Sequence, residues 1–148
     1  MQIGATADME WYWRFIDYTT ININKMMVEK NEILFIYNPT SIKDREALSY
    51  ANSLRHFKTK EYDVTREVPT KRQLVQLADK LGVSIHSLVN ERSETFIEKY
   101  KNANLDRDDL LKVLTKHPSI LKTPIAEFKH YAEFVDSTYT FIKKDMAS

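Results

Sequence analysis

One short segment of this chain carries residue types that could hold a nucleophile or an anion. Within residues 35–50, FIYNPTSIKDREALSY, three small polar residues, Asn38, Thr40 and Ser41, lie between an apolar run and a helical pattern. Backbone N–H groups at the start of a helix attract negative charge. A serine there becomes a nucleophile only when a base removes its proton and a third group orients that base. His117 is a base by residue type, but no Ser-His-Asp order is evident. We therefore do not expect a serine nucleophile.

The alternative is that the turn caps its own helix. Ser41 and Asp44 have the spacing of a capping pair, in which the serine oxygen accepts a backbone N–H of the first helical turn. A carboxylate in that turn supplies its own negative charge to the helix end. An incoming anion would therefore meet like charge. Capping is the predicted role of both residues, and contact with an anion or another ligand is the alternative.

Composition excludes several kinds of site. The chain of 148 residues suits one domain with a single core, and its 22 basic and 21 acidic side chains give no electrostatic reason to expect nucleic acid or membrane as a partner. No apolar run could span a membrane, no secretion signal is recognisable, and the cytoplasm is the default location. Because cysteine is absent, thiolate chemistry, disulfides and cysteine metal sites are excluded. We expect neither a metal nor a cofactor, since the four histidines are scattered and the two glycines cannot form a phosphate loop.

Strand and helix patterns alternate around the turn. The run ILFIY is typical of a strand that is buried on both faces, and Thr70 with Gln73 forms a capping box for a helix that ends at Gly82. The predicted elements are a strand at 33–37, a helix at 42–54, a strand at 60–65, a helix at 71–81, helical segments at 84–89, 93–101 and 106–116, strands at 123–128 and 131–135 that form a hairpin, and a terminal helix to about 144.

Residues 1–30 do not follow this pattern. Trp11, Phe15 and Tyr18 would share one face of an added helix. The segment could equally be an upstream extension, because Met26 would make a natural start. We predict an N-terminal extension at 1–30, either disordered or an added helix, followed by one domain at 31–146.

Two separated motifs resemble a known family. Residues 38–46, NPTSIKDRE, resemble the Asn-Pro-x-Cys-x-x-Ser-Arg-Glu start of glutaredoxin-coupled arsenate reductases of the ArsC type, shared in part by Spx-type transcription regulators. Residues 117–125, HPSILKTPI, are similar to their His-Pro-x-Leu-Leu-x-Arg-Pro-Ile, and RSETF at 92–96 is close to an Spx-branch stretch. The resemblance covers residues 32–146. It implies an α/β, thioredoxin-like (glutaredoxin-like) fold with a helical insert and a short mixed four-stranded sheet, in which Pro124 is a cis-proline beside the site.

The departures from this family concern its chemistry. The resemblance places the catalytic cysteine at Ser41, and a hydroxyl gains far less than a thiol from a helix N-terminus. Arginines that would hold arsenate fall on Thr123, on Asn90 and within residues 135–137, where none is present. Arg92 lies nearby in sequence but matches no catalytic position. Without these arginines a tetrahedral oxyanion loses its bidentate partners.

Two functions follow from the resemblance. The first is a non-catalytic regulator or adaptor that acts through protein contacts, for which the Spx branch suggests the RNA polymerase alpha subunit as partner. The second is a protein or enzyme that binds glutathione or a small anion in the remnant cleft. An open cleft lined by donors would favour the second, and a cleft closed by its own side chains the first. The candidate ligand-binding residues are Asn38, Thr40, Ser41, Asn90, Arg92, Thr123 and Pro124.

Overall fold

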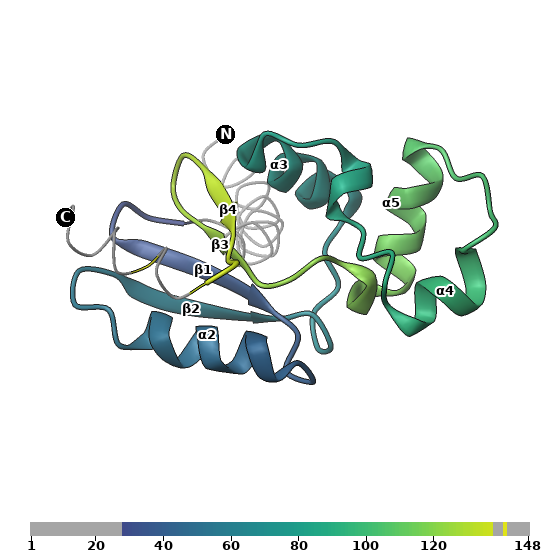
Figure 1. The fold of residues 1–148 in the computed structure, drawn as a ribbon. Coiled ribbons are helices and arrows are strands. Elements are labelled where there is room, and N and C mark those ends of the chain that lie inside the picture. Colours follow the sequence, from purple (N-terminus) through teal and green to yellow (C-terminus); the bar gives the residue numbers. More distant parts are fainter. Residues whose placement is uncertain (1–27, 138–140, 142–148) are drawn as a thin grey trace, which may run out of the picture.

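A four-stranded mixed sheet with the order β2-β1-β3-β4 organises the part of the chain that the computed structural model describes, residues 28–137 and Phe141 (Figure 1). β1 (Glu32–Tyr37) pairs in parallel with β2 (Lys58–Asp63). On its other side β1 pairs antiparallel with β3 (Ile125–Glu127), which pairs antiparallel with β4 (Ala132–Phe134). This is the predicted α/β fold with a helical insert between β2 and β3.

β1 is one of the two inner strands and separates two hydrophobic clusters. Its odd-numbered side chains, from Ile33 to Tyr37, pack with Ala47 and Ala51 of α2 (Ile42–Asn52) and with Phe141. Leu34 and Ile36 face the opposite side. Because successive side chains of a strand point to opposite faces, a strand buried on both faces reads as a continuous apolar run. The prediction from ILFIY is therefore confirmed.

The helical insert covers the second face and one end of the sheet. α3 (Lys71–Leu81) packs Leu74, Leu77 and Ala78 into the same cluster as Leu34. Figure 1 shows α3 and α2 on opposite sides of the sheet, with α5 and α4 beyond one end. The other helical segments of the insert are the 3-10 turn Ile85–Leu88, α4 (Glu94–Tyr100), α5 (Arg107–Lys116) and the 3-10 turn Pro118–Ile120.

Helix caps agree with the prediction better than strand ends do. Thr70 and Gln73 form both hydrogen bonds of the capping box, and Gly82 ends α3 in the left-handed conformation with φ 69°. β2, in contrast, begins and ends two residues earlier than predicted, at Lys58 and Asp63. Side-chain alternation in KTKEYD does not mark where pairing with β1 starts, because partner register decides that.

The predicted hairpin is present, with strands shorter than the apolar pattern suggested. Phe128 N–H donates to the Tyr131 carbonyl at 2.7 Å, which closes the turn between β3 and β4. Thr123 and Pro124 lie before the ladder, since proline has no N–H to donate. The predicted terminal helix, apart from Phe141, and the N-terminal segment 1–27 lie outside the described residues. None of the described helices is long and apolar enough to cross a membrane.

Candidate functional site

The turn between β1 and α2 is held by hydrogen bonds among its own residues. The Thr40 N–H and Oγ1 donate to Asn38 Oδ1 at 3.0 and 2.7 Å, and the Ser41 N–H donates to the Asn38 carbonyl at 3.1 Å. Ser41 Oγ accepts the Asp44 N–H at 3.3 Å, so the predicted N-cap is present. The polar side chains of Asn38, Thr40 and Ser41 are thus already engaged within the turn.

The carboxylate of Asp44 lies inside this turn. Asp44 is only 2% exposed, and its Oδ2 accepts the Asn38 N–H at 2.8 Å. Ser41 N–H bonds to a carbonyl instead, so Asp44 does not complete a reciprocal capping box with Ser41. A fixed negative charge is therefore buried where the start of α2 would otherwise attract an anion. The turn between β1 and α2 is therefore closed by the carboxylate of Asp44.

Pro124 lies beside the same turn. The Thr123–Pro124 peptide bond is cis, as the resemblance implies. Ile36 of β1 is opposite Ile125 of β3, and Pro124 directly precedes Ile125, so the proline lies near the end of β1. The carbonyl of Pro124 accepts the Val135 N–H at 2.9 Å. The proline is therefore tied to the hairpin at the point where β1 ends.

Three of the predicted residues line one open cavity of about 720 Å³. Asn90, Arg92 and Thr123 border it, together with side chains that the sequence did not single out, among them Lys122. None of the turn residues 38–44 belongs to its lining. The structure thus divides the predicted site in two: a turn filled by its own side chains and a separate cavity.

Backbone bonds between two distant segments build the floor of this cavity. Asn90 N–H donates to the Ile120 carbonyl and Lys122 N–H donates to the Leu88 carbonyl, both at 2.7 Å. Asn90 Oδ1 accepts the Arg92 N–H at 3.1 Å. Asn90 therefore shapes the loop that presents Arg92, and its uncharged amide cannot supply the bidentate cation of an arginine.

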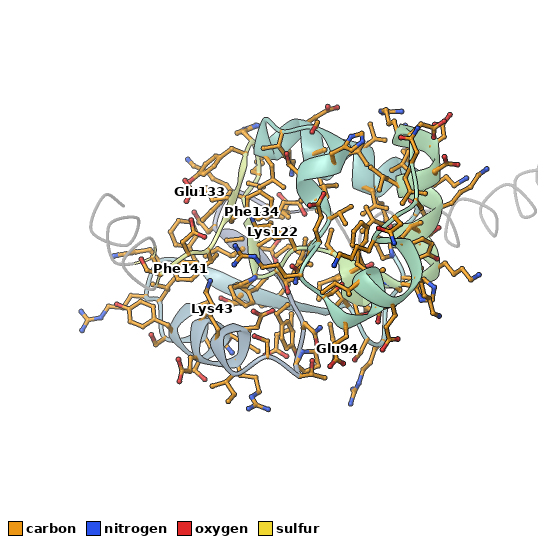
Figure 2. All side chains as sticks on the ribbon, turned by 45° about the vertical axis from the view of Figure 1, so that its right-hand side comes forward. Lys43, Glu94, Lys122, Glu133, Phe134 and Phe141 are labelled. Carbon is orange, nitrogen blue, oxygen red and sulfur yellow. The ribbon has the colours of Figure 1, made fainter. Side chains whose placement is uncertain are left out.

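Lys122 is one of the cavity residues that sequence reasoning missed. Its Nζ lies 5.0 Å from the centroid of the Phe134 ring, and Figure 2 shows the two side chains together. A cation over an aromatic face is held by the ring quadrupole. No local pattern could have revealed this contact, because Phe134 comes from β4 and meets Lys122 only when the hairpin forms.

His117 does not form a catalytic pair with Ser41. Its N–H donates to the Val113 carbonyl at 2.8 Å and ends α5, as expected for a helix stop, and its ring packs 6.0 Å from that of Tyr100. Burial, assisted by the charges of Lys99 and Lys116, lowers the pKa of His117. No hydrogen bond within the described residues joins it to Ser41.

No metal site can be built from the described part of the chain. Within residues 28–137 and Phe141, no three histidine, aspartate or glutamate side chains are grouped so that they could hold an ion. Asp106 and Asp109 form a capping box at the start of α5. Hydrogen bonds from the Asp109 backbone lower the pKa of Asp106. The acidic run is therefore the start of α5.

Comparison with known proteins identifies the fold through structure alone. No protein-family model and no curated protein matches the sequence. The arsenate reductase from Vibrio cholerae superimposes with a TM-score of 0.67 and 18% identity, covering 78% of this chain and 98% of its own. A possible arsenate reductase from Streptococcus mutans gives a TM-score of 0.61 and 15% identity, covering 75% and 97%. A protein from Staphylococcus aureus gives 0.59 and 20%, covering 74% and 96%. This chain therefore has the thioredoxin-like fold of the arsenate reductases and ArsC-related proteins.

Proposed function

We propose that this chain is a thiol-less member of the arsenate reductase and Spx group that acts by binding a protein and does not reduce arsenate. The observation that carries the proposal is the Asp44 carboxylate, which takes the Asn38 N–H at 2.8 Å in a turn where Ser41 replaces the nucleophile. A covalent bond from thiol to arsenic cannot form, because the chain has no cysteine. The Spx resemblance of residues 92–96 makes the RNA polymerase alpha subunit the partner to test first.

The remaining polar residues support loss of the reductase chemistry. Asn90 and Thr123 occupy positions where the resemblance implies arginines, and neither can offer a bidentate cation to an oxyanion. Arg92 is exposed and lines a cavity that none of the residues 38–44 borders. The arginines that the resemblance implies for holding arsenate are therefore absent, and Arg92 does not replace them beside Ser41.

Arsenate reduction is expected to be undetectable, even after a thiol is restored. The wild type and Ser41→Cys should both show no turnover with arsenate, glutathione and glutaredoxin, measured as glutathione oxidation. A buried carboxylate beside the introduced thiol disfavours the thiolate that the reaction needs. Ser41→Cys combined with Asp44→Ser is the matched control, and its thiol should react faster with a maleimide near pH 7. Turnover by the wild type would refute the proposal.

Binding of a small ligand in the cavity is the second candidate function. The observation that favours it is that Asn90, Arg92 and Thr123 border the same cavity as Lys122. Glutathione, phosphate, sulfate and arsenate can be compared by thermal unfolding. A ligand at about 100 times its dissociation constant should add about 2.7 kcal/mol. A stabilisation that Arg92→Gln removes would favour this candidate, and four flat responses would leave the protein-contact proposal standing.

A further inference from the structure

We infer that two adjoining cavities form a binding surface for an acidic peptide segment that carries a bulky apolar residue next to its carboxylates. The inference rests on the proposed function and specifies the chemistry of the partner. We call this surface the two-part groove. Its polar part is the 720 Å³ cavity bordered by Lys122 and Thr123. Its apolar part is a second cavity of about 400 Å³ bordered by Phe96, Ile97 and Tyr100.

The two cavities meet at the loop before α4. Glu91 and Arg92 line both of them, so the guanidinium side chain lies at the boundary between the polar and the apolar part. The Asn90 Oδ1 bond to Arg92 N–H and the Ser93 Oγ bond to Phe96 N–H, at 3.1 and 3.2 Å, fix the backbone on both sides of this boundary. A bound peptide could therefore contact both parts of the groove across a loop whose backbone is fixed by these two hydrogen bonds.

The charges of the polar part favour an acidic partner. Lys122, Arg92 and His86 are exposed along it, against one carboxylate, Glu91. Among the described residues, the ion pairs involve Lys60, Arg66 and Lys80, and none involves Lys122, Arg92 or His86. The ring of Phe134 already holds the Lys122 side chain, so less rotamer freedom is lost when a carboxylate binds.

The apolar part explains why we propose a peptide and not a free anion. α4 has no buried residue, and Ile97 is 45% exposed, one of three large apolar side chains that are prominently exposed in the described part of the chain. The Phe96 and Tyr100 rings lie 6.2 Å apart beside it. A small anion would leave this surface in water, whereas a peptide with an apolar residue beside its acids would cover it. A nucleic acid is disfavoured, since the net charge is only +1.

The test uses the full chain and a fluorescein-labelled peptide, Gly-Ser-Glu-Glu-Leu-Phe-Ser-Gly, followed by fluorescence anisotropy. Arg92→Gln, Lys122→Gln and Ile97→Ser should each weaken binding by about tenfold, because each removes a charge-assisted bond or a buried apolar contact. Lys71→Gln and Val68→Ser are matched controls, since both residues are exposed outside the groove. These controls should change binding by about twofold at most. Circular dichroism of each variant checks that it is folded.

Two control peptides separate the contribution of the acidic residues to binding from that of the apolar residues. Replacing both glutamates by glutamine should weaken binding and remove the dependence of peptide affinity on salt concentration. Replacing Leu-Phe by Ser-Ser should weaken binding about as much as Ile97→Ser does. Equal binding of the glutamine peptide, equal losses in the Lys71 and Val68 controls, or no saturable binding would overturn the inference. Binding of glutathione or phosphate alone, lost in Arg92→Gln, would overturn it in favour of a small ligand. Arsenate turnover by the same sample would instead refute the proposed function, and the peptide-binding result could still be interpreted by itself.

Discussion

Replacing Asp44 by alanine should lower the free energy of unfolding by about 1.5 to 3 kcal/mol, the range for a hydrogen bond to a charged group. The carboxylate is buried at 2% exposure, and its Oδ2 accepts the Asn38 N–H at 2.8 Å. Without it, the backbone donor of Asn38 loses its partner inside the turn. Urea unfolding followed by circular dichroism measures the change.

Lys43→Ala is the matched control for this prediction. Lys43 lies next to Asp44 in the first turn of α2, but its side chain is exposed. Its replacement should alter stability by no more than about 0.5 kcal/mol. Asp44→Asn keeps an acceptor oxygen, so it should lower the free energy of unfolding by less than Asp44→Ala does. Equal stability of Asp44→Ala and Lys43→Ala would show that the buried carboxylate does not hold the turn.

Replacing Lys80 by methionine should have the largest effect on stability, about 3 kcal/mol or more. Lys80 Nζ lies 2.9 Å from Glu127 Oε1 and also donates to the Phe128 carbonyl at 3.0 Å. Glu127 is 4% exposed, and its Oε2 has no hydrogen-bond partner among the described residues. Removing the lysine therefore leaves a buried carboxylate without its only ion-pair partner in the described part of the chain. Denaturant unfolding near neutral pH measures the loss.

The double variant Lys80→Met with Glu127→Leu is the control for buried charge. An apolar pair of similar volume restores packing without an unpaired ion, and such replacements of buried ion pairs are often close to neutral. The double variant should therefore be more stable than Lys80→Met alone. If the two variants were equally unstable, lost packing of α3 on the sheet would explain the effect, and the charge would not.

The same pair also sets the direction of a pH dependence. Burial raises the pKa of Glu127 above the ordinary 4.5, although Lys80 acts to lower it. A carboxyl with a raised pKa in the folded state contributes stability that is fully present below its unfolded pKa and lost as pH rises through its folded pKa. Without Lys80 this loss should grow. The deficit of Lys80→Met should therefore shrink as the pH is lowered toward 4.5, while Glu127→Gln should remove the trend.

Short-range features of this protein could be predicted from the sequence. The caps at Ser41 and Thr70, the left-handed end of α3 at Gly82 and the strand buried on both faces all depend on residues within about four positions of one another. Resemblance of two motifs added the fold and the cis bond before Pro124. Hydrogen bonds between near neighbours and short sequence motifs carry this information, whatever the rest of the chain does.

Tertiary structure decided which side chains come together in the turn, in the two-part groove and in the buried ion pair. The Asp44 carboxylate could have faced solvent or the turn, and only packing of α2 against the sheet places it on the Asn38 N–H. Lys122 meets Phe134 when the hairpin forms, and Lys80 of α3 meets Glu127 of β3 when α3 packs on the sheet. Because such contacts depend on how the helical insert and the hairpin close on β1, no spacing rule along the chain could have predicted the two-part groove or the buried ion pair.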